Sequence, residues 1–419
     1  MRELRDSGIE WIGHIPADWN VVRIGTQYTE RKTKVSDRDY PPLSVTMKGI
    51  LPQLATAAKT DAHDDRKLVC KGDFAINSRS DRRGSCGIAP CDGSVSLINT
   101  ILCPRDEMNP RYYDWLFHST MFSDEFYRWG HGIVDDLWTT NWQDMKRIFI
   151  PEPSLEEQER IADFLDRVCA EIDAVIASTK ATIEEYKALK QAIITEAVTK
   201  GIRGDRTMKD SGVEWIGEIP VGWNRNSIKN VSTTCSGGTP TSGDETMYDG
   251  DINWVCSYDL KEKPIYESGR KITQKGADSI AGKMQIPGSV LIAMYGGSGT
   301  IGNSGILECE ARTNQAICSV KFNNNYVMDY YGFYYTLAIR KHWMIYAVGT
   351  RKDPNISQDV VKRMPCLIPP LEEQREIVAF LNNKCAEIDT LIANKTYLLE
   401  ELEQYKKSII YEYVTGKKR

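Results

Sequence analysis

The stretch LEEQERIADFLDRVCAEIDAVIA, residues 155–177, returns as LEEQREIVAFLNNKCAEIDTLIA at residues 371–393, and 14 of the 23 positions are identical. A second stretch repeats with it: SGIEWIGHIPADWN at residues 7–20 returns as SGVEWIGEIPVGWN at residues 211–224, with 10 of 14 positions identical. The chain is therefore an internal duplication. Each copy consists of a short motif, a variable body and a long helix.

The two bodies, roughly residues 21–150 and 225–367, align at only a few positions. Among these, GDFAIN (72–77) and GSVLIAMYG (288–296) are matching apolar runs that begin with glycine and predict equivalent strands. Aromatic-rich segments at 111–128 and 327–346 predict short helices. The sequence predicts mixed α/β bodies on one repeated scaffold, which presents the same docking surface twice and reads two different things.

Apolar residues follow a heptad in both repeated helices, which predicts one side of a coiled coil, twice. At about 1.5 Å per residue, some 45 residues make a rod of about 65 Å that needs a partner helix. The other copy is the simplest partner, and a pseudo-two-fold axis would set the helices antiparallel with one body at each end. The expected seam comprises Ile161, Leu165, Val168, Ile172, Val175, Thr179, Thr182, Tyr186, Leu189 and Ile193, and then Ile377, Leu381, Lys384, Ile388, Leu391, Lys395, Leu398, Leu402, Tyr405 and Ile409.

The predicted organisation has four parts. They are a first globular domain at 1–150, a helical region at 151–205, a second domain at 206–367 and a second helical region at 368–419. Two interpretations fit the SG-x-EWIG motif: a plug that caps its own body, or a shared docking surface. Near-identity in two divergent bodies favours the docking surface, with Trp11 and Trp215 as its partner-binding residues.

Composition limits the classes of protein that fit. The 419 residues carry a net charge of −5, and no apolar run approaches the roughly 18 residues that a membrane span needs. The start, MRELRDSGIE, lacks the pattern of a signal peptide, so we expect a cytoplasmic chain. Eleven cysteines contain no CxxC pair, which favours reduced, mostly buried thiols and predicts no metal site.

The sequence lacks a catalytic motif. Gly297, Gly299 and Gly302 match GxGxxG, but no helical pattern follows and no acidic residue lies at the distance that a ribose contact requires, so a tight strand-to-strand turn is the better interpretation. The chain also lacks a GxxxxGK[ST] loop, a GxSxG elbow and the [DNS]PP[FYW] tetrapeptide of amino-methyltransferases. We therefore predict a reader rather than an enzyme.

Polar loops supply the candidate reading residues, because Arg pairs with guanine and Asn with adenine through two hydrogen bonds. For each residue taken singly, a surface loop or a structural hydrogen bond is an equal alternative. The candidate DNA-binding residues are Asn77, Arg79, Arg82, Arg83, Trp138 and Asn141 in the first body, and Tyr295, Asn314, Gln315, Arg351, Lys352 and Asn355 in the second.

Together these features resemble the specificity subunit of Type I restriction-modification systems. The resemblance covers the whole chain and rests on SGIEWIG-x-IP-x-x-W, IP-x-P-x-LEEQ-x-x-I-x-x-FL, EAVTKG at 196–201, and the core residues Ala170, Ile172, Asp173 and Ile176. The second copy ends EYVTGKKR instead, a departure from the pattern near the C-terminus.

The resemblance implies two target recognition domains joined by two long antiparallel helices. It implies a non-catalytic subunit that recognises an asymmetric bipartite target in double-stranded DNA and directs adenine-N6 methylation and restriction. Two modification subunits would grip the helices, with restriction subunits as optional further partners; AdoMet, ATP and magnesium would belong to those partners. Two rivals stay open: a free-standing enzyme, and a protein-binding scaffold that reads no DNA sequence.

Overall fold

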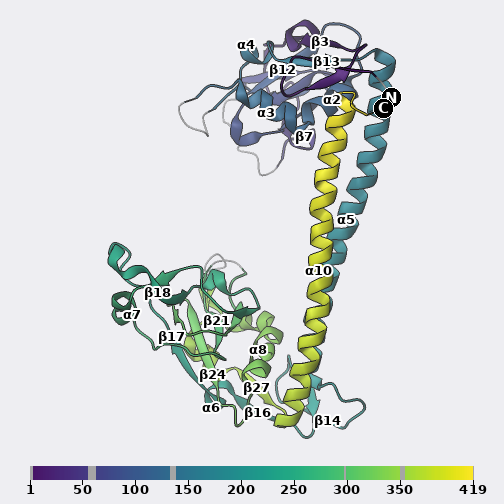
Figure 1. Cartoon of the computed structure of the whole chain (residues 1–419). Coiled ribbons are helices and arrows are strands. Elements are labelled where there is room, and N and C mark those ends of the chain that lie inside the picture. The colour runs from purple at the N-terminus through teal and green to yellow at the C-terminus, as the bar shows by residue number, and fades with distance from the viewer. Residues whose placement is uncertain (1–2, 55–62, 133–137, 297–298, 350–353, 419) are drawn as a thin grey trace. The chain divides into compact units, whose positions relative to one another are not determined.

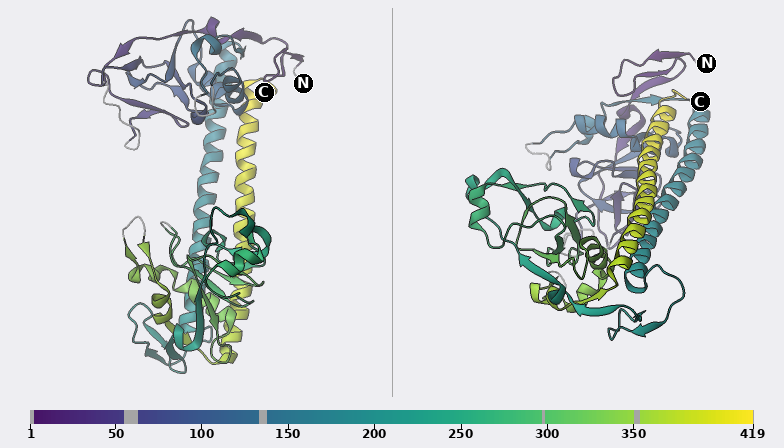
Figure 2. Two further views of the ribbon diagram at one scale, coloured as in Figure 1. Left: turned by 90° about the vertical axis from the view of Figure 1, so that its left-hand side faces the viewer. Right: turned by 60° about the horizontal axis from the view of Figure 1, so that its bottom comes forward.

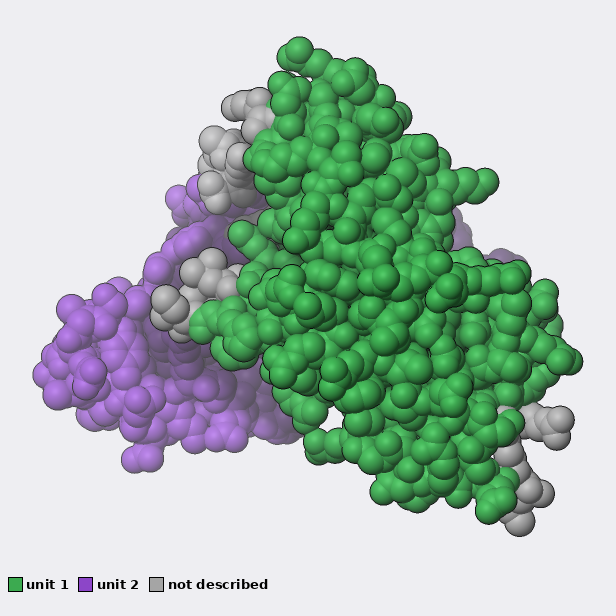
Figure 3. Space-filling view, turned by 90° about the horizontal axis from the view of Figure 1, so that it is seen from above, with its two compact units in different colours: residues 1–180, 396–419 green, residues 181–395 purple. Residues whose placement is uncertain are grey.

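The computed structural model describes residues 3–54, 63–132, 138–296, 299–349 and 354–418. The chain forms two compact units, shown in different colours in Figure 3. Unit 1 comprises residues 1–180 and 396–419, and unit 2 comprises residues 181–395. Each unit thus contains a globular domain and part of both long helices. Across the described ranges, no helix has a stretch that is both long and apolar enough to span a bilayer.

The long helices are α5 (Leu155–Lys200) and α10 (Leu371–Val414), both prominent in Figure 1. Glutamates occupy the first turn of each helix, where the helix dipole favours negative charge. Gly201 ends α5 and Gly416 follows α10, with φ of 78° and 70°. That left-handed conformation suits glycine and closes a helix C-terminus.

Ion pairs between the helices give their direction within each unit. In unit 1 Asp173 pairs with Lys406 at 2.6 Å and Lys180 with Glu403 at 3.6 Å. In unit 2 Lys190 pairs with Asp389 at 2.7 Å. Because the residue numbers of these partners rise along α5 while they fall along α10, the two helices are antiparallel, as predicted. The Asp173–Lys406 and Lys190–Asp389 pairs are equivalent under the 216-residue repeat.

The seam of the helix pair departs from the strict heptad. Ile161, Leu165, Ile172, Ile377, Leu381 and Ile388 are buried as expected, at 0–7% exposure. Five other predicted seam residues are 39–52% exposed, and for these the prediction was wrong: Val175, Leu189, Leu391, Leu398 and Tyr405.

The buried row shifts by one residue along each helix, so Ile183 and Ile194 are buried where Thr182 and Ile193 were expected. Cys385 likewise takes the place predicted for Lys384, whose amine contacts Glu387 at 2.8 Å on its own helix. The physical reason is that a straight helix has 3.6 residues per turn and drifts relative to a heptad. The five exposed residues are therefore available to contacts outside this pair.

The first domain is built on an antiparallel sheet in the order β10 (Cys86–Ile88), β9 (Phe74–Asn77), β12 (Asn99–Pro104) and β4 (Tyr28–Glu30). Two separate helices, rather than one over 111–128, follow the sheet, because Ser119 is extended and caps the second. The other elements are β1 (Leu4–Asp6), β2 (His14–Pro16), β3 (Asn20–Arg23), α1 (Ile24–Gln27), β5 (Lys34–Val35), β6 (Leu43–Thr46), β7 (Gly49–Pro52), β8 (Arg66–Val69), η1 (Ser80–Arg82), β11 (Gly93–Ser96), α2 (Pro110–His118), α3 (Thr120–Arg128), α4 (Trp142–Met145) and β13 (Phe149–Glu152).

The second domain repeats this design with one added strand. Its sheet runs β17 (Ser232–Ser236), β24 (Ile317–Phe322), β21 (Val290–Ala293), β22 (Ser304–Leu307) and β19 (Pro264–Ile265). The other elements are β14 (Met208–Asp210), β15 (Glu218–Pro220), β16 (Asn224–Ser227), α6 (Ile228–Val231), η3 (Glu245–Met247), β18 (Tyr248–Val255), η4 (Ser257–Asp259), β20 (Lys271–Ile272), α7 (Gln274–Ser279), β23 (Arg312–Thr313), α8 (Asp329–Ala338), η5 (Arg340–Tyr346), β25 (Val348–Gly349), β26 (Pro354–Asn355), α9 (Gln358–Arg363) and β27 (Pro365–Ile368).

The two sheets share one topology although their sequences diverge. The order β10-β9-β12-β4 corresponds to β22-β21-β24-β17, and the matching glycine-led runs of the sequence lie on β9 and β21 as predicted. Further views of both domains are given in Figure 2. The duplication therefore includes the central sheet of each domain.

Each domain core is closed by both long helices. In unit 1 the core includes Ile161 and Leu165 from the start of α5 and Val414 from the end of α10. In unit 2 it includes Ile377 from the start of α10 and Val198 from the end of α5. Each globular domain therefore rests on the first turns of one long helix and the last turns of the other.

The first turn of each long helix fixes its domain through buried polar groups. Glu157 accepts a hydrogen bond from Trp19 Nε1 at 2.8 Å, and Glu373 accepts one from Trp223 Nε1 at 3.0 Å. The next residue in each helix is a glutamine. Gln158 accepts a hydrogen bond from Asn109 N at 2.9 Å and donates one to the Pro153 carbonyl at 2.9 Å. Gln374 accepts one from Met328 N at 2.8 Å and donates one to the Pro369 carbonyl at 2.9 Å. We call these Glu–Gln pairs the helix-start anchors.

Replacing Gln374 with Ala should destabilise the second domain. The substitution removes the partners of the Met328 N–H and the Pro369 C=O, and each buried group left unsatisfied costs about 1–3 kcal/mol. We expect the free energy of unfolding, measured by urea titration, to fall by at least about 2 kcal/mol. The control is Glu372→Ala at an exposed position of the same turn. Equal losses for both variants would contradict the role of the anchor.

Candidate nucleic-acid interface

Three loops meet in the first domain at the end of its sheet where strand β9 finishes and strand β12 begins. The loop after β9 contains the predicted Arg79, Arg82 and Arg83, and the loop before α4 contains Trp138. Backbone hydrogen bonds join these two loops: Ser80 N donates to Trp138 O at 3.0 Å, and Thr140 N donates to Ser78 O at 2.9 Å. The Ser78 N–H reaches Ile98 O at 3.3 Å, which adds the loop before β12.

The second domain uses the same hydrogen bonds. Ile356 N donates to Met294 O at 2.9 Å, 216 residues after the Thr140 and Ser78 pair. Met294 N donates to Ala316 O at 2.7 Å, and this hydrogen bond corresponds to the one from Ser78 N to Ile98 O in the first domain. In both domains, hydrogen bonds between backbone groups therefore bring together the loops that contain the candidate DNA-binding residues.

The predicted residues of the first domain differ in their freedom to bind a ligand. The arginines at 79, 82 and 83 are exposed. Asn77 is 6% exposed, and its Oδ1 accepts a hydrogen bond from Arg79 N at 3.0 Å, which fits the alternative of a structural hydrogen bond. Asn141 caps α4 by accepting from Gln143 N at 2.7 Å and donates to Asp144 at 2.7 Å. For Asn141, the alternative of a structural hydrogen bond fits the geometry.

The second domain presents fewer candidates. Tyr295 is partly buried, which raises its pKa, and Asn314 Oδ1 accepts from Ala316 N at 3.1 Å. Gln315 is exposed and accepts a hydrogen bond from the Thr239 hydroxyl, and Asn355 is exposed on β26. The predicted Arg351 and Lys352 lie outside the described residues. Of the GxGxxG glycines, Gly297 lies outside the described residues. Gly299 and Gly302 lie in the connection between antiparallel β21 and β22, where Gly302 N donates to Ala293 O at 2.9 Å, in agreement with a strand-to-strand turn.

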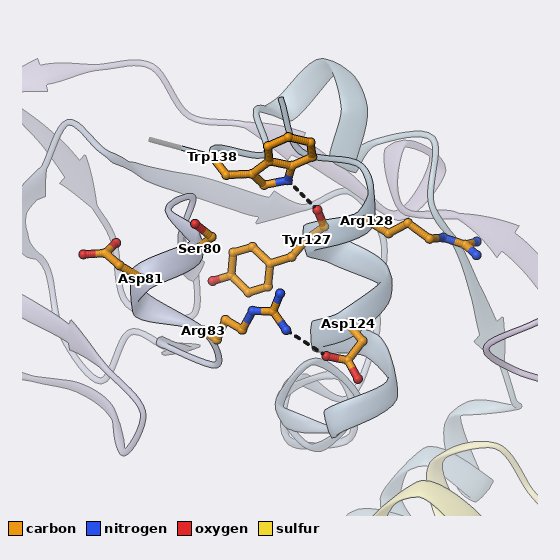
Figure 4. A pocket seen from close by; sticks show the side chains of 7 residues that line it. All are labelled: Ser80, Asp81, Arg83, Asp124, Tyr127, Arg128 and Trp138. Carbon is orange, nitrogen blue, oxygen red and sulfur yellow. Dashed lines mark hydrogen bonds and ion pairs between the residues drawn. The ribbon is translucent and has the colours of Figure 1, made fainter. Parts of the chain in front are cut away.

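A pocket of about 760 Å³ opens beside the first loop cluster (Figure 4). Trp138 Nε1 donates to the Tyr127 carbonyl at 2.8 Å, and Arg83 contacts both Asp124 and the ring of Tyr127. The sequence did not indicate the α3 residues, because an aromatic-rich helix predicts core packing and gives no sign of the polar edge it presents. The pocket is lined by Ser80, Asp81, Arg83, Asp124, Tyr127, Arg128 and Trp138.

The two motif tryptophans differ in exposure. Trp11 is 4% exposed, its Nε1 donates to Phe149 O at 3.2 Å, and its ring meets Phe122 edge-on. Trp11 is thus packed within its own domain, which fits the capping alternative. Trp215 is half-buried and stacks on His342 with ring centroids 4.2 Å apart. Across the described parts of the chain, no three His, Cys, Asp or Glu side chains gather as a metal site would require.

Comparisons with known proteins agree with this architecture. Residues 220–404 match the family described as Type I restriction modification DNA specificity domain. A type I restriction enzyme MjaVIII specificity subunit from Methanocaldococcus jannaschii is 24% identical over 426 residues, which cover 97% of this chain and 94% of the relative.

Two solved structures share the fold. A chain from a study of complex assembly and conformational transition in the type I R-M system has a TM-score of 0.73 at 16% identity, covering 96% of this chain and 98% of that one. The HsdS subunit from Thermoanaerobacter tengcongensis has a TM-score of 0.51 at 17% identity, with the same coverage.

Two domains of one topology on a duplicated helical scaffold are thus the architecture of a class of proteins described as specificity subunits. Residues 220–404 match the DNA specificity domain of type I restriction-modification systems, and the chain is similar over almost its whole length to their specificity subunits.

Replacing Asn141 with Ala should lower stability without changing what the domain reads. Loss of an N-cap costs about 1 kcal/mol, and Asn141→Asp should keep the cap. We expect urea unfolding to show this difference, and methylome mapping of the assembled complex to return one motif for both variants. A changed motif in Asn141→Ala alone would restore this residue to direct reading.

Proposed function

We propose that the chain recognises an asymmetric, bipartite sequence in double-stranded DNA through its two loop clusters. The observation that carries this proposal is that one sheet and one set of backbone hydrogen bonds occur twice with different side chains around them. A repeated scaffold would position each domain alike on a duplex. Divergent side chains would then select a different run of base pairs in each half of the target.

The side chains at repeat-equivalent positions support an asymmetric target. Trp138 corresponds to Pro354 under the 216-residue repeat. The arginine-rich loop after β9 corresponds to a glycine-rich connection after β21. Since base edges are read by hydrogen-bond donors and acceptors, such different loops would not select the same bases.

Catalysis in this proposal belongs to partner subunits. The chain would act in the cytoplasm as a non-catalytic subunit that directs adenine-N6 methylation, and restriction where a restriction subunit is present. AdoMet, ATP and magnesium would be bound by those partners. The alternative, a protein-binding scaffold without sequence preference, would leave the complex equally active on all DNA.

The exposed apolar row on the long helices supports two copies of one partner. Val175 and Tyr405 in unit 1 are 48% and 52% exposed, and their repeat equivalents Leu391 and Leu189 in unit 2 are 43% and 48% exposed. Each unit therefore exposes one apolar side chain on each long helix, at the same two helix positions, and we call each such pair of residues a patch. Exposed apolar residues in register along a helix are typical of a docking surface for another helix. We propose that one modification subunit binds each patch.

Exchanging residues 225–367 for the matching segment of a relative should change one half of the methylated motif. The first loop cluster lies wholly in the other domain, so its half of the motif should persist. Single-molecule mapping of N6-methyladenine in cells that express the exchanged chain with its modification subunits would measure this. Changes in both halves, or a palindromic motif in the parent, would contradict a modular reader.

Introducing charge into one patch should remove one partner. The double variant Leu189→Glu, Leu391→Glu places carboxylates on the exposed row of unit 2 and leaves the buried seam intact. We expect native mass spectrometry to shift from two bound modification subunits to one. The matched control, Glu184→Ala with Glu387→Ala, alters exposed residues of the same helices and should keep two. A parent complex with one modification subunit at saturation would refute the stoichiometry.

A further inference from the structure

The pocket beside the first loop cluster contains one arginine that is held in place on two sides. Arg83 Nη1 contacts Asp124 Oδ1 at 3.2 Å, and its guanidinium lies 5.2 Å from the centre of the Tyr127 ring. Its side chain is nevertheless 60% exposed. Figure 4 shows Arg83 between these two residues. We propose that Arg83 reads a guanine of a G·C base pair in the half-site of the first domain, which rests on the proposed function.

The aromatic residue beneath Arg83 is itself fixed. The Tyr127 hydroxyl lies 3.4 Å from the Asn77 carbonyl and 3.3 Å from the Arg82 carbonyl. Its own carbonyl accepts the Trp138 Nε1 hydrogen bond at 2.8 Å. Tyr127 is 3% exposed, so the ring forms a rigid floor under the guanidinium. A side chain oriented in this way before binding loses less conformational freedom when it meets a base.

The charges around Arg83 favour a base edge over a phosphate. Asp124 neutralises the guanidinium in part, and Asp81 also lines the pocket. The second cation of the lining, Arg128, pairs with Glu10 and Glu125, so a phosphate would meet carboxylates as well as cations. Phosphate binding relies on the positive charge of Lys and Arg, and these carboxylates reduce the net positive charge of the pocket. A base edge carries no net charge and tolerates both carboxylates.

The donor and acceptor pattern matches G·C. Guanine offers O6 and N7 as adjacent acceptors in the major groove, which an arginine contacts through two N–H groups. The paired cytosine offers its N4 amino group as a donor, and an aspartate accepts from it. Among the described contacts, Arg83 makes its hydrogen bond through Nη1, which leaves Nη2 and Nε as donors. An adenine would place an amino donor against these N–H groups, so Arg83 together with Asp124 discriminates against an A·T base pair.

The adjacent Arg82 supplies a matched control. It carries the same charge, is 67% exposed and lies 3.5 Å from Asp81. It does not line the pocket, and among the described residues no aromatic ring lies beneath its guanidinium. Arg82→Lys and Arg83→Lys therefore preserve charge at neighbouring positions, and only the second removes a planar guanidinium from the pocket.

The decisive measurement is the methylated motif of the complex reconstituted with its modification subunits. We expect Arg83→Lys to relax one guanine position in the first half of the motif and to leave the second half unchanged. Arg82→Lys should leave the selection of that guanine position as in the parent, because Arg82 does not line the pocket. Uniformly weaker methylation with every motif position retained would indicate a phosphate contact and overturn the proposal. So would a first half-site without a G·C pair.

A binding experiment identifies the contacted atom. Duplexes that carry the parent motif receive 7-deazaguanine at one guanine of the first half-site at a time, which removes N7. We expect affinity for the parent complex to fall about ten- to a hundredfold at one position. The Arg83→Lys complex should show no further loss at that position. Independent losses from the base change and the substitution would contradict the contact.

Two further variants test the holding residues. Asp124→Asn and Tyr127→Phe retain shape, and urea unfolding would confirm that they fold. We expect Asp124→Asn to weaken selection at the same base pair, because it frees the guanidinium for a phosphate; an unchanged motif would count against its role as a positioning residue. A complex without any sequence preference would refute the proposed function itself, whereas a bipartite motif independent of Arg83 would refute this inference alone.

Discussion

Everything else in each unit depends on the helix-start anchor, a buried pair of polar side chains at the first turn of a long helix. A helix begins with N–H groups that lack partners within the helix. In each unit, the last strand of the globular domain leads directly into the first turn of the long helix. In this chain Glu157 and Gln158, and equally Glu373 and Gln374, bond to the domain rather than only to their own helix. Leaving a buried polar group without a partner destabilises the fold by more than forming its hydrogen bond stabilises it. The anchor therefore fixes the domain in one orientation on its helix.

A fixed orientation explains how the loops can diverge while their positions stay the same. The loops meet through main-chain bonds, as Thr140 to Ser78 in one domain and Ile356 to Met294 in the other. Such bonds do not depend on the side chain at either position. The side chains of the loops are therefore free to change without moving the surface that carries them, which is what a protein with variable specificity requires.

Sequence patterns predicted what recurs and failed where tertiary contacts decide. The duplication, both long helices, their antiparallel direction and the equivalence of β9 and β21 follow from repeats and periodicity. For Asn77 and Asn141 the sequence left a reading role and a structural hydrogen bond as equal alternatives, because a polar loop side chain gives the same sequence signal whether it faces solvent or bonds to nearby backbone. The heptad extrapolation failed because the helices drift at 3.6 residues per turn.

Tyr127 and Asp124 went unnoticed for a different reason. They lie on a helix whose aromatic residues predict burial, and their approach to Arg83 spans more than 40 residues of chain. Contacts of this kind have no local signature in a single sequence. They were found only once the fold had placed α3 against the loop after β9.

The limits of the internal symmetry bear on how partners bind. The Tyr411 hydroxyl lies 3.1 Å from the Trp11 carbonyl and 3.0 Å from that of Ile12, so in unit 1 the motif is tied to the end of α10. The repeat equivalent of Tyr411 is Thr195, which bonds to its own helix at 2.8 Å and borders a hollow of about 600 Å³ in unit 2. The two units thus agree at the helix-start anchors and along the exposed helix row, and differ at the helix ends. A partner that binds both units in the same way would therefore use a surface that the two units share, such as the exposed helix row, and not the helix ends at which they differ.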